Sequence, residues 1–212
     1  MAIFLIILAI ILALPFLVIF GFLHIVTESF EAFGLPPGVV IAILLAMLVG
    51  SVANIPLGRR RLVETQDVRF FGLIRQKRYM PQGLSINVGG ALIPLFLALY
   101  LLQFAPLKET LTACAIMIVI CFALARFMPG KGIGLPTLLP ALFATLIALI
   151  LAGDQAAPVA FVSGVFGVII GADLLHLPRV MRQGQGVMSI GGAGVFDGIF
   201  IIAIVAAFLA GL

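Results

Sequence analysis

The sequence contains few charged residues. Only 9% of its 212 residues are Asp, Glu, Lys or Arg, whereas 64% are hydrophobic. A soluble domain usually carries about 25% charged residues, so this chain lacks the polar surface that would cover a water-soluble globule. We therefore expect lipid around most of it. The isoelectric point near 9.6 does not indicate a nucleic-acid partner, because the basic residues lie in short loops between apolar runs.

The chain also lacks the motifs of several enzyme classes. It has no nucleotide-binding loop, no cluster of Cys and His at metal-ligand spacing and no nucleophile elbow. Its two cysteines, Cys114 and Cys121, are seven residues apart on one expected helix. That spacing is about 10 Å along the axis, which is too far for a disulfide between them. The sequence therefore predicts no cofactor and no metal centre.

What the chain has instead is a series of long apolar runs. A membrane-spanning helix needs about 20 mostly apolar residues, and seven segments meet or approach that length. The sequence predicts an all-α polytopic bundle that forms one transmembrane domain over residues 1–212. The expected spans are 3–26, 37–57, 86–104, 110–127, 135–152, 157–177 and 190–211. The first lacks the basic start of a secretory signal peptide, so we expect it to be a retained span.

The basic residues predict the orientation. Eleven of the twelve Lys and Arg residues lie in the second, fourth and sixth loops of this seven-span arrangement, and most of them lie in the loop 58–85. Loops rich in Lys and Arg face the cytoplasm. We therefore expect an inner or plasma membrane protein with its N-terminus inside, its C-terminus outside and a cytoplasmic basic loop at 58–85.

The two halves of the chain resemble each other weakly. With a shift of 121 residues, Leu14-Pro15 falls on Leu135-Pro136 and Gly50 falls on Gly171, and Ser85-Ile86 with Gly89-Gly90-Ala91 is similar to 189–193. This similarity predicts a parallel repeat of spans one to three in spans five to seven, with halves at 1–105 and 130–212. Chance matches between apolar helices are the alternative.

Two aspartates stand out within the last two spans. An ionisable residue inside a span is costly and is by default a candidate for a functional site. Asp173 lies near the inner end of the sixth span and Asp197 near the inner start of the seventh. At 1.5 Å per residue both lie roughly 6–11 Å below the same surface, so the hairpin is expected to bring them together. Two adjacent carboxyl groups would share one proton. The alternative for Asp197 is a helix cap, and for Asp173 an ion pair with a nearby arginine.

Other residues are expected to line this site. His176 follows Asp173 by three residues on the same helical face, where it would bond to Asp173, act as a base or join a weak metal site. A polar interface residue is the simpler interpretation. Gly191, Gly192 and Gly194 would allow close packing or an unwound segment. Asn87, at the inner end of the third span, would line the same cavity.

The segments Gly171-Ala-Asp173-Leu-Leu and Ser189-Ile-Gly-Gly-Ala-Gly-Val-Phe-Asp197-Gly-Ile-Phe resemble an uncharacterised prokaryotic membrane family, domain of unknown function 1614. The similarity extends over most of the chain and includes Ile86–Pro94. It implies a polytopic membrane protein and no particular activity.

A second resemblance is mechanistic. Presenilin-like and signal-peptide-peptidase-like intramembrane aspartyl proteases have one aspartate on a helix, a second in a Gly-x-Gly-Asp motif on the next and a Pro-Ala-Leu motif on a third. Here Asp173 matches the first aspartate, Gly192-Ala-Gly194 the glycines, and Pro140, Ala141 and Leu142 the third motif. Val195 stands where the motif has its aspartate, and Pro-Ala-Leu precedes the aspartates instead of following them.

Three functions remain open. The first is a membrane-embedded aspartyl hydrolase in which Asp173 and Asp197 activate water to cut a transmembrane peptide. The second is a small proton- or cation-coupled transporter or channel that uses the same acids. The third is a scaffold that turns over no substrate and binds membrane lipids, with the basic loop attracting anionic lipid. The sequence indicates no nucleic-acid partner and no oligomeric state.

Overall fold

The computed structural model describes residues 2–31, 34–58, 61–69, 74–128, 132–136, 138–183, 187–192, 199, 205 and 208. Among these, the side chains of 2–9, 22, 26, 29, 61–82, 132, 183 and 187 are not described.

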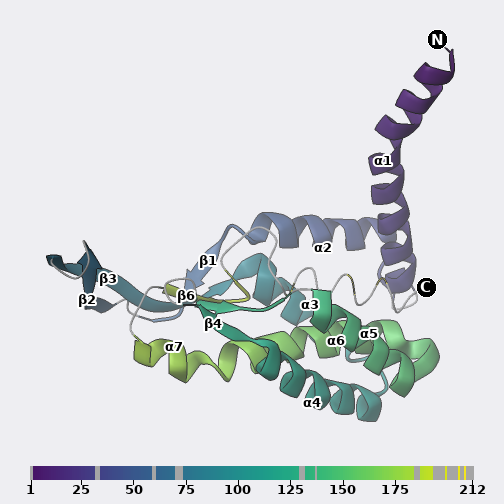
Figure 1. The fold of residues 1–212 in the computed structure, drawn as a ribbon. Coiled ribbons are helices and arrows are strands. Elements are labelled where there is room, and N and C mark those ends of the chain that lie inside the picture. The colour runs from purple at the N-terminus through teal and green to yellow at the C-terminus, as the bar shows by residue number, and fades with distance from the viewer. Residues whose placement is uncertain are drawn as a thin grey trace.

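The chain is mostly helical, as expected from its composition. The helices are α1 (Ala2–Glu31), α2 (Pro37–Gly50), α3 (Ile93–Leu101), α4 (Leu107–Leu124), α5 (Leu138–Ala152), α6 (Ala156–Phe166) and α7 (Leu177–Gln183), shown in Figure 1. Two π-helical segments of the described chain adjoin them: η1 (Val88–Leu92) leads into α3, and η3 (Gly167–Leu174) continues α6. A 3-10 turn, η2 (Gly153–Gln155), joins α5 to α6.

Within the described residues, two helical runs are long and apolar enough to cross a membrane, by length and composition. They are Leu107–Leu124, and Leu138–Arg182. The second run reverses at Gly153, whose φ of 53° breaks the helix, and α5 packs back against α6. Shorter apolar helices occur at Ile10–Ile25, Pro37–Gly50 and Val88–Leu101.

Six strands in the described part of the chain depart from the all-α expectation. They are β1 (Asn54–Pro56), β2 (Arg61–Arg69), β3 (Ile74–Asn87), β4 (Arg126–Met128), β5 (Gly132–Gly134) and β6 (Val187–Ile190). The long strand β3 pairs antiparallel with β1 and β2 and parallel with β6, while β4 and β5 form a separate hairpin. The region 58–85, expected to be a loop, therefore consists largely of a β-hairpin. The expected spans 37–57 and 86–104 are shorter helices that adjoin strands at this sheet.

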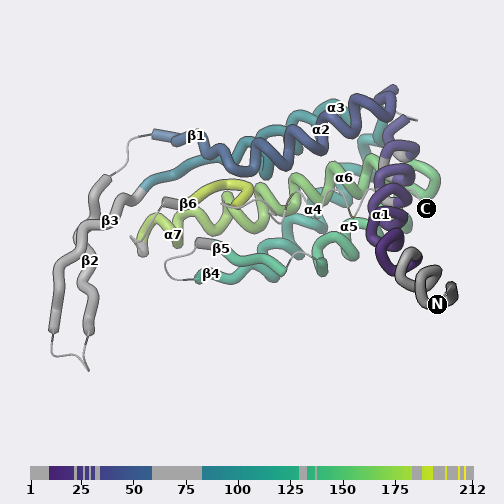
Figure 2. The backbone as a smooth tube through the Cα atoms, turned by 90° about the horizontal axis from the view of Figure 1, so that it is seen from above, coloured from purple at the N-terminus to yellow at the C-terminus, as the bar shows by residue number. Residues whose placement is uncertain are grey.

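Helix α1 does not run alongside the others. Figures 1 and 2 show it crossing one end of the layer formed by the remaining helices, near the start of α2. Its described side chains from 10 to 20 are all exposed. The protein core instead surrounds α6, on which nine residues are buried, and Phe30 at the end of α1 meets Phe161 of α6 edge to face at 5.6 Å.

The burial pattern of α4 and α5 is the reverse of the pattern in a soluble protein, because mainly small side chains are buried and large apolar side chains are exposed. The side chains that α4 buries are Thr110, Ala113, Met117 and Cys121, and those that α5 buries are Pro140, Ala141, Ala144, Thr145 and Ala148. The leucines of both helices are mainly exposed. Small residues let helix backbones approach closely where lipid already solvates the large apolar side chains, so this arrangement is typical of helices packed within a membrane.

Candidate functional site

Asp173 is a buried acid on the π-helical segment η3. Its side chain is 8% exposed, and its Oδ2 accepts a hydrogen bond from the backbone N–H of Gly191 at 2.8 Å. The bond joins the end of the α6–η3 helix to the chain that follows β6. A buried carboxylate requires such donors, because an unsatisfied one is costly. The structure therefore places Asp173, one of the two predicted catalytic acids, at the contact between η3 and the turn that follows β6.

Two glycines place η3 directly against α4. A methyl group at Gly167 would lie 2.8 Å from Met117 Cβ, and one at Gly171 would lie 2.3 Å from the carbonyl oxygen of Ile118. Gly167 and Gly171 are four residues apart, which is the spacing of the small-residue motif that lets membrane helices approach. This spacing was available in the sequence as a signal of close helix packing at the Asp173 segment, and the structure identifies α4 as the neighbour.

Gly191 occupies a tight turn at the end of β6. Its φ is 78° and that of Gly192 is 80°, a left-handed region that favours glycine. A methyl group at Gly191 would lie 2.5 Å from Ala91 Cβ, so this turn packs on η1. Gly191 and Gly192 were predicted to permit either an unwound segment or close packing, and at Gly191 both occur.

Asn87 is fully buried where β3 meets η1. Its Nδ2 donates to the carbonyl oxygen of Ser51 at 2.6 Å, and its Oδ1 accepts the N–H of Gly90 at 2.6 Å, which caps η1. Asn54 Oδ1 lies 3.2 Å from Asn87 Nδ2 and accepts the hydroxyl of Ser189 at 2.5 Å. We call Asn54, Asn87 and Ser189 the polar strand cluster. Of its members the sequence predicted Asn87 alone as a site residue.

His176 contacts the backbone of η3 and an aromatic ring of α4. Its Nδ1 lies 3.0 Å from the carbonyl oxygen of Ala172 and 3.3 Å from that of Gly171, and its ring stacks on Phe122 at 4.6 Å. The prediction of a shared face assumed α-helical spacing, whereas η3 is π-helical and ends at Leu174. Within the described residues, no group of three His, Cys, Asp or Glu side chains is arranged to hold a metal ion.

The predicted Pro-Ala-Leu residues lie on α5. Pro140 and Ala141 are buried, while Leu142 is exposed. The main helix neighbours of α5 are α4 and α6, not the segment η3 that carries Asp173. Their role at a catalytic site stays a prediction.

The second acid, Asp197, and the predicted glycine Gly194 lie outside the described residues. Most of the expected last span, 190–211, also lies there. The carboxylate separation that the dyad hypothesis requires is therefore still a prediction.

The two segments that resemble each other in sequence are neighbours in space. β3 and β6 pair in parallel with Ser85 opposite Ser189 and Ile86 opposite Ile190, and the Ser85 hydroxyl donates to the carbonyl oxygen of Met188 at 3.1 Å. This is the alignment that the sequence similarity suggested. The internal repeat itself stays a prediction.

Comparison with known proteins identifies a family. The model described as "Protein of unknown function (DUF1614)" matches residues 48–209, which is more than half of the chain. The chain belongs to this family. No curated protein and no solved structure matches it.

The DUF1614 match includes every residue discussed at the candidate site. The polar strand cluster, Asp173, Gly191 and Asp197 all fall within 48–209, whereas α1 precedes the match. The match thus covers all six strands, both described π-helical segments and α3 to α7, whereas most of α2 also precedes it.

Proposed function

We propose that this protein is a membrane-embedded aspartyl hydrolase that uses Asp173 and Asp197. The observation that carries the proposal is the hydrogen bond between the buried Asp173 carboxylate and the N–H of Gly191. Gly191 precedes Asp197 by six residues, so the segment bearing the second acid starts in contact with the first. On a regular helix six residues advance about 9 Å, which is within reach of a shared site.

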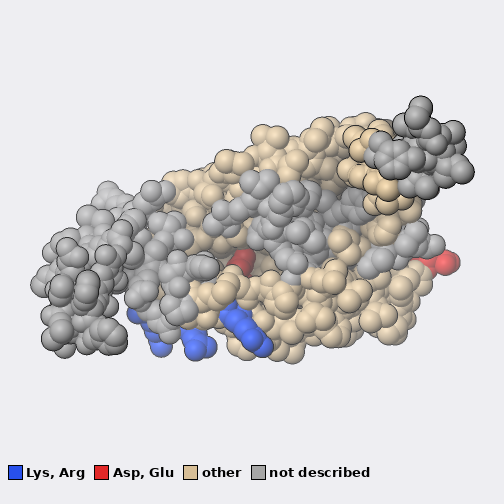
Figure 3. Space-filling view, turned by 45° about the horizontal axis from the view of Figure 1, so that its top comes forward, with Lys and Arg blue, Asp and Glu red and all other residues tan. Residues whose placement is uncertain are grey.

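The packing and charge distribution support a location in the membrane. The inverted faces of α4 and α5 fit a lipid environment. In Figure 3 the visible Lys and Arg side chains gather toward the end of the molecule that carries α7, and acidic residues are visible at the opposite end and in the interior. That asymmetry agrees with the proposed seven-span arrangement, in which the basic end faces the cytoplasm.

The chemistry needs one ionised and one protonated carboxyl group. The ionised group removes a proton from water, whose oxygen attacks the carbonyl carbon of the peptide bond, while the protonated group donates its proton to the carbonyl oxygen. Collapse of the tetrahedral intermediate breaks the C–N bond, and the amine leaves with a proton from the first carboxyl group. The hydroxyl proton of the intermediate then returns to the second group, which restores the starting state.

Replacing either aspartate by asparagine should abolish cleavage. The measurement is hydrolysis of a panel of synthetic single-span peptides by purified protein in vesicles. Asp173→Asn and Asp197→Asn should each lower the rate at least about 100-fold, because general acid–base catalysis contributes that much or more. Asp154→Asn is the matched control, since Asp154 is exposed in the turn between α5 and α6 and should tolerate the change. Cleavage retained in Asp173→Asn would remove that residue from the mechanism.

A second candidate, proton- or cation-coupled transport, is favoured by the polar strand cluster. Asn54, Asn87 and Ser189 lie where helices are interrupted by strands. Interrupted helices with exposed backbone groups are common at the ion and substrate sites of transporters. If this function is correct, a pH gradient across vesicles should drive solute or proton flux that Asp173→Asn suppresses while Asp154→Asn leaves it intact. If sealed vesicles that contain the wild-type protein show no flux over a broad panel of solutes, the protein does not act as a transporter of this kind.

A further inference from the structure

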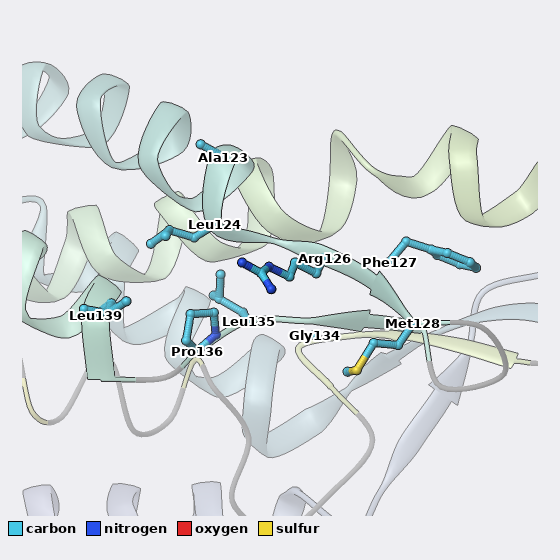
Figure 4. A pocket seen from close by; sticks show the side chains of 9 residues that line it. All are labelled: Ala123, Leu124, Arg126, Phe127, Met128, Gly134, Leu135, Pro136 and Leu139. Atoms are coloured by element: carbon cyan, nitrogen blue, oxygen red, sulfur yellow. The ribbon is translucent and has the colours of Figure 1, made fainter.

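A concave site lies at the C-terminal end of α4. It is a groove of about 650 Å³ between the end of α4, the β4–β5 hairpin and the start of α5. Its size is that of a small-molecule site. Figure 4 shows its walls, which include Leu124, Phe127, Leu135, Pro136 and Leu139. Arg126 is the one residue among those that line it with a charged or polar side chain.

One charged side chain extends into this apolar groove. Arg126 on β4 lies along it, with its guanidinium group between Leu124 and Leu135 in Figure 4. Among the described side chains the one ion pair is His24 with Glu28, so no described carboxylate neutralises Arg126. A guanidinium group presents several donors in a planar fork that matches phosphate oxygens. The groove therefore offers a cation to an anionic ligand.

An apolar stripe leads away from the groove along α5. Leu139, Leu142, Leu146 and Leu149 follow one another at spacings of three and four residues, which places them on one helical face. Their exposed fractions are 45%, 42%, 54% and 45%. A ligand whose anionic group lies at Arg126 and whose hydrocarbon lies on this stripe would satisfy both surfaces. A free phosphate would leave the stripe uncovered.

We propose that this groove binds an acidic phospholipid, with its phosphate group at Arg126 and an acyl chain along the leucine stripe of α5. Arg126 belongs to the fourth loop of the chain, which the distribution of basic residues places on the cytoplasmic side. The cytoplasmic leaflet contains anionic lipids, so ligand and site would occupy the same surface. This proposal does not depend on the hydrolase proposal.

The absence of tryptophan from the chain provides a direct test. In full-length Leu139→Trp protein the new indole is the sole tryptophan and lies in the groove. The protein is reconstituted in vesicles that contain zwitterionic phosphatidylcholine and acidic phosphatidylglycerol, with one lipid or the other brominated to quench fluorescence. We expect brominated phosphatidylglycerol to quench about fivefold more effectively per molecule than brominated phosphatidylcholine, as expected for one arginine near the surface. Equal quenching by the two lipids would overturn the proposal.

Three controls test whether the preference for the acidic lipid arises at Arg126. Phe96→Trp, on an exposed part of α3 that lines neither the groove nor the stripe, should show no preference for the acidic lipid. Arg126→Gln in the Leu139→Trp background should abolish the preference, whereas Arg182→Gln, which removes an equal charge from α7, should retain most of it. Equal losses in the two arginine variants would indicate diffuse attraction and overturn the proposal. Complete relief of the quenching by inorganic phosphate would also overturn the proposal, because it would indicate a site for a free anion.

Discussion

Gly89→Ala should destabilise the protein strongly, because the added methyl group has no space between η1 and α2. The new Cβ would lie 1.8 Å from the carbonyl oxygen of Met47 and 2.3 Å from the backbone nitrogen of Ser51. These two atoms share a hydrogen bond of 2.9 Å at the end of α2, so neither can move without disturbing the helix terminus. We expect a loss of about 3 kcal/mol, the upper part of the range for overpacked sites. Thermal unfolding in detergent micelles, followed by circular dichroism, would measure it.

Gly38→Ala is the matched control for Gly89→Ala. Gly38 lies in α2 with no heavy atom within 4 Å of an added Cβ. Alanine is about 1 kcal/mol better than glycine within a helix, so this variant should be neutral or slightly more stable. Equal thermal stability of Gly89→Ala and Gly38→Ala would show that α2 and η1 are not in the close contact described.

Gly191→Ala should combine backbone strain with a clash. The left-handed conformation costs alanine about 1–2 kcal/mol, and the methyl group would also lie 2.5 Å from Ala91 Cβ and 2.7 Å from Ala91 N. Overpacking adds roughly 1–3 kcal/mol. Because the N–H of Gly191 binds Asp173, relief of the clash would also pull this donor away from the carboxylate. We expect both lower thermal stability in micelles and weaker peptide cleavage.

Gly153→Ala separates the effect of backbone strain from the effect of the clash. Gly153 also has a positive φ, of 53°, but nothing lies within 4 Å of an added Cβ. It should lose only the strain energy, about 1–2 kcal/mol, and keep the activity of the wild type. If Gly153→Ala and Gly191→Ala were equally stable and equally active, the contact of Gly191 with η1 would have no energetic role.

The apolar runs predicted the helices of the second half of the chain closely. The expected spans 110–127, 135–152 and 157–177 correspond to α4, α5 and α6 with η3. Their mean hydropathy is high over a sufficient length, and that quantity depends on composition rather than on tertiary contacts. The reversal at Gly153 falls where Asp154 and Gln155 interrupt the apolar run.

The strands could not be predicted in the same way. A hydropathy window averages over both faces, so it does not detect an alternation with a period of two. In β3, Ser85 and Asn87 are buried whereas Leu84 and Ile86 are half-buried, the reverse of the pattern of a strand in a soluble protein. The pairing of β3 with β6 joins segments about 100 residues apart and depends on contacts that no local pattern encodes.

The candidate site was predicted in part. Asp173 was identified because an acid in an apolar run is costly, and Asn87 because it adjoins Gly89-Gly90. Asn54 and Ser189 were missed as site residues, because each is an ordinary polar residue until β1, β3 and β6 bring them together. His176 was placed on the face of Asp173 by α-helical spacing, because the sequence does not distinguish a π-helix from an α-helix; its role at the site stays a prediction.

The π-helical form of η3 makes the length of this segment as important as its composition. A π-helix closes each hydrogen-bonded turn with one more residue than an α-helix. A relative with one residue fewer between Gly167 and Asp173 would continue α6 as a regular helix over nearly the same angle, so its carboxylate would still face the amide of Gly191. A relative of equal length whose segment formed a regular α-helix would instead turn its carboxylate by roughly 100° around the axis, away from that amide. The contact thus depends on the length and the helical form of the segment together.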